Sequence, residues 1–463
     1  MRKENLIQLK RDSRLSSKQV TDQLTDGSRV AVMGGGPSGS LFAYYLLELA
    51  ERIDLELNVD IYEPRDFSRV GPPGCNMCAG IISESLIQAL AVDGINLPST
   101  VIQRGINSYV LHNELGKTCL DTPFLEKRIG VVFRGSGPRD GKDREWQSFD
   151  GFLLDRAVEK GASVIHKRVT GVERVEGGLM IGCRDADPQK YDFLAVATGV
   201  NTNAIRLFEA LESGYQPPRV AQAFIREYYL GEEKAEGTFG NTVHFFLLNL
   251  PGLEFAAAVP KGSYVTICLL GGGLSQELLE TFLQTPQVKS CMPPGWSPEE
   301  FVCHCSPRIN ISGAIQPFAD RMVFLGDIGV SRLYKDGIGA AYRAAKAAAS
   351  AAVFEGVGED DLRKYYGRAS RRLERDNLIG KAIFAFVGMV IKPRRFMSRA
   401  MLRMVASEQS KPAAQQRMSS ITWDIFTGSA PYADIALRIL HPFFLSKFLW
   451  FAATSLIGGQ GEG

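Results

Sequence analysis

Three glycines near the start of the chain have the spacing that a bound diphosphate requires. Gly34, Gly36 and Gly39 follow a short apolar run, and the next apolar run is followed by Glu63. A G-x-G-x-x-G turn lets the backbone approach the diphosphate, whose charge lies at the N-terminus of the following helix. The acid is placed to accept a hydrogen bond from a ribose hydroxyl. The pattern predicts a dinucleotide site, with a ligand-free glycine turn as the alternative. The neighbouring residues Pro37, Ser38, Pro64 and Arg65 are further candidates for contact with the dinucleotide.

A second glycine-rich segment, GDIGVSRLYKDGIG, lies far along the chain. A strand-like run delivers Gly326 and Asp327 to a turn, and an alanine-rich run follows Gly337, Ile338 and Gly339. Small residues with helical spacing predict a helix that packs closely on its neighbours. A strand end, a glycine turn and a helix N-terminus would present backbone N–H groups to an anionic or electron-rich group.

The middle of the chain supplies the elements between these two motifs. An apolar strand ends in Thr198 and Gly199, and a helix is predicted over residues 149–160. Hairpin-like strands are predicted through Val164 and Val169.

The ordered set GGGPSG, YE, FDGFLLDRAVEKGA, ATG and GD…GIG resembles the FAD-dependent oxidoreductases of the p-hydroxybenzoate hydroxylase-like fold. The resemblance implies an α/β protein with a Rossmann-type FAD-binding domain, an interleaved antiparallel-sheet substrate domain and a C-terminal helical region. It implies that the first motif, together with Glu63, holds the ADP part of FAD. It also implies that Asp327 contacts the ribityl chain or diphosphate, and that the helix after Gly339 points at the flavin ring.

This resemblance divides the chain into segments. We expect an N-terminal extension (1–28), FAD-binding segments (29–105, 136–205 and 311–355), substrate-domain segments (106–135 and 206–310) and a C-terminal helical region (356–463).

Two stretches are similar to the geranylgeranyl reductases, which saturate double bonds of polyprenyl chains. Cys78, Ala79 and Gly80 match the reductase segment that lies near the isoalloxazine ring. Residues 253–271 resemble the reductase signature Y-x-W-x-F-P, whose aromatic residues line the substrate cavity. Here Phe255, Ala257 and Val259 replace the three aromatic residues and Pro260 is retained, which predicts a wider or different substrate pocket lined by these four positions.

Tyr334 and Lys335 stand where many members of the fold have proline and phenylalanine beside the flavin. A cation near the flavin N1 favours the anionic reduced form. The alternative is that Lys335 points to solvent. Tyr334 and Cys78 are candidate proton donors by position, so these three residues are the candidate catalytic residues.

The cysteines allow further chemistry. Cys75 and Cys78 form a C-x-x-C pair, and Cys303, His304 and Cys305 form another tight group. Together they could bind zinc or an iron–sulfur cluster, or the first pair could form a redox disulfide. Neither group has the second C-x-x-C that makes a metal signal strong, so no metal is predicted.

The bulk composition excludes several classes of protein. A formal net charge of +2 in 463 residues gives no case for nucleic acid as a partner. Eight cysteines in a chain without a signal peptide are expected to be reduced thiols in the cytoplasm. No stretch reaches the roughly 20 apolar residues of a membrane span.

The C-terminal region nevertheless has the composition of an interfacial membrane anchor. Residues 436–459 are rich in phenylalanine and leucine, and the stretch before them carries seven cations against the single acid Glu408. Aromatic residues at the acyl boundary with cations on anionic headgroups suit peripheral membrane attachment. The alternative is a helical bundle folded back on the flavin domain. The cations are Lys392, Arg394, Arg395, Arg399, Arg403, Lys411 and Arg417.

These features predict an enzyme, an FAD-dependent oxidoreductase. Its expected reaction is reduction of C=C bonds of a polyprenyl or other lipidic substrate by hydride transfer. The alternatives are an FAD-dependent monooxygenase and a quinone-linked membrane dehydrogenase. The electron donor is left open among NAD(P)H, ferredoxin and a quinol, so an electron-donor protein is a possible partner. The chain has no W-x-W-x-I-P segment, which argues against a flavin halogenase.

Overall fold

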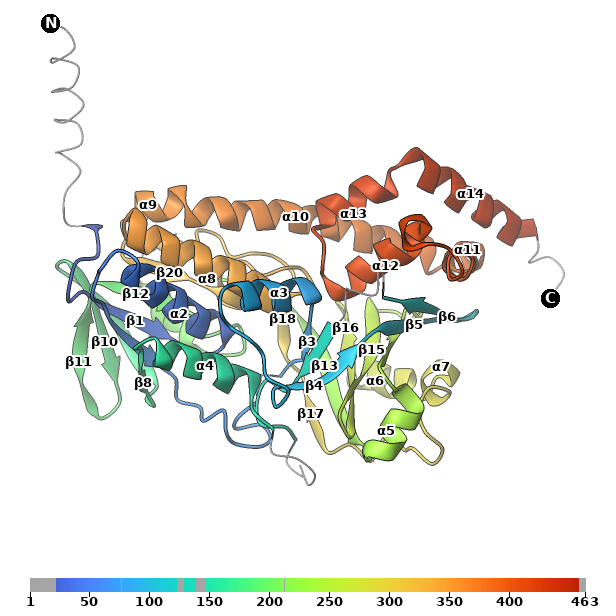
Figure 1. The fold of residues 1–463 in the computed structure, drawn as a ribbon, viewed down its shortest axis with the longest axis horizontal. Helices are drawn as coiled ribbons and strands as arrows, with labels where there is room; N and C mark the ends of the chain where they lie inside the picture. Colours follow the sequence, from blue (N-terminus) through green and yellow to red (C-terminus); the bar gives the residue numbers. More distant parts are fainter. Residues whose placement is uncertain (1–21, 76, 123–128, 139–145, 212, 458–463) are drawn as a thin grey trace, which may run out of the picture.

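The computed structural model describes residues 22–75, 77–122, 129–138, 146–211 and 213–457. Most of the predicted N-terminal extension lies outside these residues. The described chain has two sheet-based parts, and the long helix α10 (Tyr366–Phe386) runs from the first toward the C-terminal helices beside the second (Figure 1).

A six-stranded, mostly parallel sheet forms the first part. Its order is β19 (Phe318–Ala319), β20 (Met322–Phe324), β12 (Phe193–Val196), β1 (Arg29–Met33), β2 (Asn58–Tyr62) and β8 (Ser163–Ile165), with only β19 antiparallel. The expectation for Val164 was wrong: β8 pairs in parallel with β2, whereas the hairpin forms between β9 (Val169–Val175) and β10 (Gly178–Cys183).

Both faces of this sheet are covered, as parallel sheets require. Val30 and Val32 of β1 face α2 (Pro37–Glu51), α4 (Phe149–Glu159) and α8 (Gly337–Phe354). The alternate residues of β1 face β9, β10, β11 (Ala186–Tyr191) and the 3-10 helix η3 (Ala204–Leu211). The buried alanines of α8 let it lie close to α2, as their composition predicts.

An eight-stranded sheet forms the second part. Its strands are β17 (Cys303–Cys305), β13 (Val220–Tyr229), β16 (Tyr264–Leu270), β15 (Phe255–Lys261), β14 (Thr242–Phe246), β5 (Ser108–Asn113) and β6 (Gly116–Asp121), with β18 (Arg308–Asn310) beside β13. Three helices border its outer side: α5 (Glu232–Phe239), α6 (Gln276–Leu283) and α7 (Pro286–Lys289). A small sheet of β3 (Ile81–Ile82), β7 (Ile129–Val132) and β4 (Ile102–Ile106), with α3 (Glu84–Val92), lies between the two parts.

A pair of histidines is buried in this second sheet. Nε2 of His112 lies 2.9 Å from Nδ1 of His244, and their rings stack. Burial lowers the pKa of His112 to about 3, with a contribution from His244, and burial lowers the pKa of His244 to about 4. The pair is therefore neutral in the folded protein at neutral pH.

The remaining helices begin beside the six-stranded sheet, where the first of them contacts β19 and α8, and continue over the inner face of the eight-stranded sheet. They are α9 (Glu359–Lys364), α10, the π-helix η5 (Val387–Ile391), α11 (Arg395–Ala406), the 3-10 helix η6 (Ala413–Gln415), α12 (Arg417–Thr427), α13 (Tyr432–Ile439) and α14 (Pro442–Ile457). Trp423 and Phe426 of α12 contact Tyr109 and Phe245 of the sheet. Helix α12 is therefore folded back on the eight-stranded sheet of the substrate segments, and not on the FAD-binding segments that the alternative named.

Within the described chain, no single helix is both long and apolar enough to cross a membrane. Helices α13 and α14 reach that length and composition only as a pair, and they are bent by 66° where they meet. The predicted α/β architecture, with an interleaved antiparallel sheet and a C-terminal helical region, is confirmed.

Candidate active site

A cavity of about 720 Å³ lies between the two sheets. Its lining includes the residues that directly follow β1, β2 and β12. Open α/β sheets bind their ligands at this edge, outside the carboxyl ends of the strands. From there the cavity extends to β13 and β16 of the second sheet.

Two of the predicted glycines, Gly39 and Gly326, do not line the cavity but allow the close backbone packing next to it. A Cβ atom on Gly39 would lie 1.8 Å from the carbonyl oxygen of Gly34, so only glycine lets α2 begin this close to β1. Gly326 has a φ of +65°, and a Cβ there would lie 2.0 Å from Oγ of Ser38. The two motifs, nearly 300 residues apart in sequence, are therefore in direct contact.

Glu63 ties the end of β2 to the glycine turn. Its carboxylate accepts hydrogen bonds from the backbone N–H of Gly35 at 2.9 Å and of Arg65 at 2.8 Å. Burial raises the pKa of Glu63, and these two bonds oppose the rise. The carboxylate lines the cavity where the sequence predicts the ribose contact.

At the other motif, Asp327 lies beside the start of α8. A Cβ on Gly337 would lie 3.9 Å from Oδ1 of Asp327, and Nδ2 of Asn310 donates to the Asp327 carbonyl at 2.5 Å. Oδ1 of Asn310 and Oγ1 of Thr198 are buried, and neither atom has a hydrogen-bond partner among the described residues. Because both residues line the cavity, a polar ligand there would satisfy atoms that are costly to leave unpaired.

Cations outnumber acids in the lining of the cavity. Arg134, which the sequence analysis missed, forms a two-bond ion pair with the fully buried Asp150, including an Nη2–Oδ2 contact of 2.8 Å. The signal was present: Asp150 lies in the FDGFLLDRAVEKGA motif and needed a buried partner. A cation-rich lining suits a diphosphate. The cations are Arg65, Arg134, Arg168, Arg308, Arg332 and Lys335, and the acids are Glu63, Asp327 and Asp336.

The residues present fit FAD. The glycine turn, the unpaired polar atoms and the excess of cations lie along one cavity, which is what a long dinucleotide with a diphosphate centre requires. The predicted cofactor residues that line it are Gly34, Gly36, Pro37, Ser38, Glu63, Pro64, Arg65, Cys78, Ala79, Gly80, Val169, Thr198, Gly199, Asp327, Gly337 and Ile338. Gly39, Gly326 and Gly339 lie outside this lining.

Lys335 points inward, so the alternative of a solvent-facing lysine was wrong. Its Nζ lies 4.6 Å from the ring centre of Phe255 and 5.2 Å from that of Phe245. Burial lowers the pKa of Lys335, and the thiols of Cys268 and Cys78 act in the opposite direction. Within the described chain the ammonium has no carboxylate partner.

Tyr334 lines the same end of the cavity. Burial raises the pKa of Tyr334 to about 12, so the phenol keeps its proton at neutral pH. Its ring meets those of Phe255 and Phe384 edge-on.

The predicted substrate wall is displaced along the sheet. Phe255, Ala257, Val259 and Pro260 are buried in β15 and do not line the cavity. The wall comes instead from the neighbouring strands β13 and β16, because the cavity opens beneath them. Its residues are Ala223, Ile225, Cys268 and Leu270. Phe255 acts only indirectly, through its contacts with Tyr334 and Lys335.

The two cysteine groups lie near each other: burial raises the pKa of Cys75 and of Cys305, and in each case a thiol of the other group adds to the rise. Cys75 and Cys78 are thiols without a disulfide. Among the residues that the structure describes, no three His, Cys, Asp or Glu side chains are grouped closely enough to hold a metal ion.

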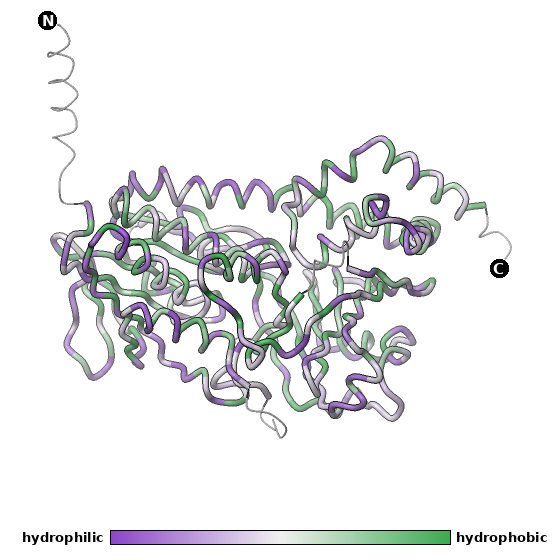
Figure 2. The backbone as a smooth tube through the Cα atoms, in the orientation of Figure 1, coloured by the Kyte–Doolittle hydropathy of each residue, from purple (hydrophilic) through white to green (hydrophobic). Residues whose placement is uncertain are grey.

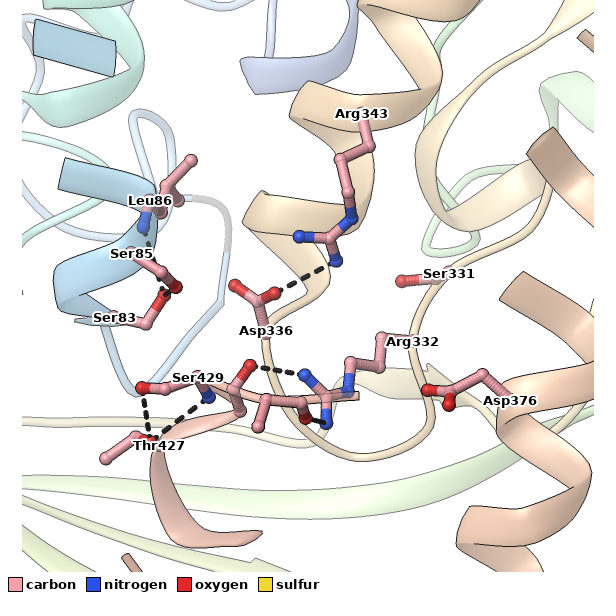
Figure 3. Close-up of polar contacts among 12 residues, drawn as sticks. Ser83, Ser85, Leu86, Ser331, Arg332, Asp336, Arg343, Asp376, Thr427 and Ser429 are labelled. Atoms are coloured by element: carbon pink, nitrogen blue, oxygen red, sulfur yellow. Dashed lines mark hydrogen bonds and ion pairs between the residues drawn. The ribbon is translucent and has the colours of Figure 1, made fainter. Parts of the chain in front are cut away.

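The loop between α12 and α13 contacts residues that line the cavity near the start of α8 (Figure 3). Arg332 donates from its two terminal nitrogens to the carbonyls of Gly428 and Ala430. Asp336 pairs with Arg343 of α8 at 3.0 Å. The cavity lining is thereby joined to the C-terminal helices.

No protein-family model matches the chain, and no curated protein matches its sequence. Solved structures do share its fold. A flavoprotein/dehydrogenase from Cytophaga hutchinsonii has a TM-score of 0.58 and 13% identity, over 95% of this chain and 100% of that one. The halogenase PltM in complex with phloroglucinol and FAD has a TM-score of 0.57 and 13% identity, over 94% and 92%. The peptidyl tryptophan dihydroxylase QhpG has a TM-score of 0.54 and 18% identity, over 81% and 78%. The chain therefore has the fold of FAD-dependent flavoproteins.

Proposed function

We propose that the protein is an FAD-dependent oxidoreductase that acts as a monooxygenase on an apolar substrate. The observation that carries the proposal is the two-part cavity: a cation-rich arm at the glycine motifs, and an apolar wall of Ala223, Ile225 and Leu270 beside Lys335 and Tyr334. When bound, FAD supplies two-electron redox chemistry and, once reduced, reactivity toward O₂.

The residues of this chain have separable roles in the proposal. Arg65 would pair with the diphosphate, and the turn around Gly34 would let the backbone approach it, while Arg134 keeps its ion pair with Asp150. The wall from β13 and β16 excludes water from the substrate. Lys335 offsets negative charge that develops beside it, because no carboxylate of the described chain already neutralises its ammonium.

The comparisons support oxygen chemistry by analogy of fold, since a halogenase and a dihydroxylase are among the similar structures. The absence of W-x-W-x-I-P favours hydroxylation over halogenation. In the proposed reaction one atom of O₂ enters the substrate and the other leaves as water. The two electrons come from a donor of the NAD(P)H, ferredoxin or quinol class.

A second candidate is reduction of a C=C bond in a polyprenyl or related lipid. It is favoured by the position of Cys78, Ala79 and Gly80, which line the cavity as the reductase resemblance implies. The quinone-linked dehydrogenase stays a prediction.

One experiment separates the candidates. The purified protein is reduced under argon and then mixed either with O₂ and an apolar aromatic compound, or with a polyprenyl lipid without O₂. Product that carries one oxygen atom from ¹⁸O₂ supports the monooxygenase. Flavin reoxidation by the lipid without O₂ supports the reductase instead. A protein that neither contains FAD nor binds added FAD would overturn both.

A further inference from the structure

The outward side of α14 carries no charge. Its exposed residues recur at helical spacing and form one apolar stripe, with Trp450 at 59% and Ile457 at 75% exposure. The opposite side of α14 is buried through Phe444, Phe451 and Ala452, and α14 packs against α11. A helix on a water-exposed surface normally has its charged residues on the outward side. The stripe consists of Phe443, Ser446, Leu449, Trp450, Ala453, Leu456 and Ile457, and Leu437 and Leu440 extend it onto α13.

The one charged residue of α14 is turned inward. Nζ of Lys447 lies 2.7 Å from Oε1 of Glu408, whose side chain is fully buried. The other oxygen of Glu408 accepts from the N–H and Oγ of Ser419 at 3.0 and 3.1 Å. This arrangement fixes α14 with its apolar stripe outward. In Figure 2 the first half of α10 is hydrophilic, whereas hydrophobic and neutral residues predominate along α14.

Cations lie beside the stripe. Arg417 is exposed and stacks over the ring of Phe443 at 4.9 Å, and Arg403 is exposed and bonds to Thr454 and Ser455 of α14. Of the three acids between residues 392 and 457, Glu408 and Asp424 are buried and paired with cations, Lys447 and Arg438, whereas Asp434 of α13 is exposed. The surface beside α14, where Arg403 and Arg417 lie, is therefore cationic.

From this arrangement we infer that α13 and α14 dock the protein onto an anionic membrane surface. The stripe enters the boundary between headgroups and acyl chains, and Arg403 and Arg417 pair with lipid phosphates. The 66° bend and the packing of α14 on α11 suit helices that lie on a bilayer. A second copy of the chain fits less well as the partner. In a symmetric dimer Arg403 and Arg417 of one copy would face the same cations of the other, and like charges repel. The inference goes beyond the proposed function and does not depend on it.

The test uses the full-length protein and two kinds of vesicle, one of phosphatidylcholine alone and one that also contains phosphatidylglycerol. We expect the protein to co-float with the anionic vesicles and the fluorescence of Trp450 to shift to the blue. The double variant Leu449→Ser/Trp450→Ser should reduce vesicle binding at least about tenfold. Arg417→Gln should weaken binding to the anionic vesicles only.

The matched control is Val92→Ser, which removes an 86% exposed apolar residue of α3. It should bind vesicles like the unchanged protein, and all variants should keep the same circular dichroism spectrum. Failure of the unchanged protein to co-float with anionic vesicles would overturn the inference. So would equal binding by the Leu449→Ser/Trp450→Ser variant. Sedimentation that shows a dimer lost in that variant, without vesicle binding, would assign the stripe to a second copy instead.

Discussion

The cavity and the surface of α13 and α14 depart from the usual distribution of polarity in opposite directions. In the cavity, arginines and unpaired polar atoms such as Oγ1 of Thr198 surround an internal space. On α14, the charges are internal and the apolar side chains face outward. Polar atoms inside and apolar surface outside are the informative exceptions in a protein. Each exception indicates the chemistry of the ligand that would relieve it: an anion in the cavity, and a lipid surface at α14.

The largest expected effect of a single substitution is at the buried pair that orients α14. Lys447→Met leaves the carboxylate of Glu408 buried without its cation, so the free energy of unfolding should fall by about 3–5 kcal/mol. The double variant Glu408→Gln/Lys447→Met should lose less, because no buried charge remains. Urea unfolding measures both. Equal losses in the two variants would mean that the pair does not hold α14 in place.

The histidine pair in the sheet that both regions share should make stability depend on pH. The folded-state pKa values of His112 and His244, about 3 and about 4, lie below the ordinary value of 6.5. The unfolded chain therefore binds these protons first, and stability should fall as the pH drops below about 6.5. The fall should continue to about pH 3–4, at up to about 1.4 kcal/mol per pH unit for each histidine.

Urea unfolding between pH 7 and pH 4 measures this dependence. The variant His112→Phe/His244→Phe should have a flatter profile. A profile as steep as that of the unchanged protein would assign the dependence to other groups.

In the cavity, Asp327→Ala should weaken FAD retention about 10- to 100-fold, the cost of losing hydrogen bonds to a charged group. Flavin absorbance after gel filtration measures it, and circular dichroism checks the fold. Asp187→Ala, at an exposed aspartate of β11, is the control and should retain FAD. An Asp327→Ala protein that purifies with a full complement of FAD would remove Asp327 from the proposed site.

The smallest expected effect is at Lys335. If its ammonium offsets charge on the reduced flavin, Lys335→Met should lower the midpoint potential by about 20–40 mV, which corresponds to about 1–2 kcal/mol for a two-electron couple. Lys335→Arg keeps the cation and should keep most of the potential. An unchanged midpoint potential in Lys335→Met would mean that the ammonium does not act on the flavin, and only a role in contact with the substrate would remain.

The sequence predicted the parallel-sheet part well because its signals are local. The spacing of Gly34, Gly36 and Gly39 and the alanines of α8 depend on neighbouring residues only. The three-residue strand β8 was misjudged, because its pairing with β2 is made about 100 residues away.

The substrate side of the cavity, around Lys335 and the wall of β13 and β16, could not be predicted in this way because it depends on contacts between distant segments. Lys335 points inward because it packs against Phe245 and Phe255 of other strands. The way the two sheets meet decides that β16, and not β15, lines the cavity. Arg134 could be found only through its partner Asp150. None of these relations leaves a spacing pattern in the chain.

Arg332 connects the two regions mechanically. It lines the cavity, holds the carbonyls of Gly428 and Ala430, and lies over the ring of Tyr432, the first residue of α13. The hydroxyl of Tyr432 donates to the carbonyl of Leu333 at 2.5 Å, and a Cβ on Gly428 would lie 2.6 Å from Cβ of Asp336. Because of this close packing, α13 cannot move independently of the segment that carries Lys335. A force that tilts α13 would therefore reach the cavity, so that the proposed docking of α13 and α14 on a membrane would also alter the geometry of the cavity lining.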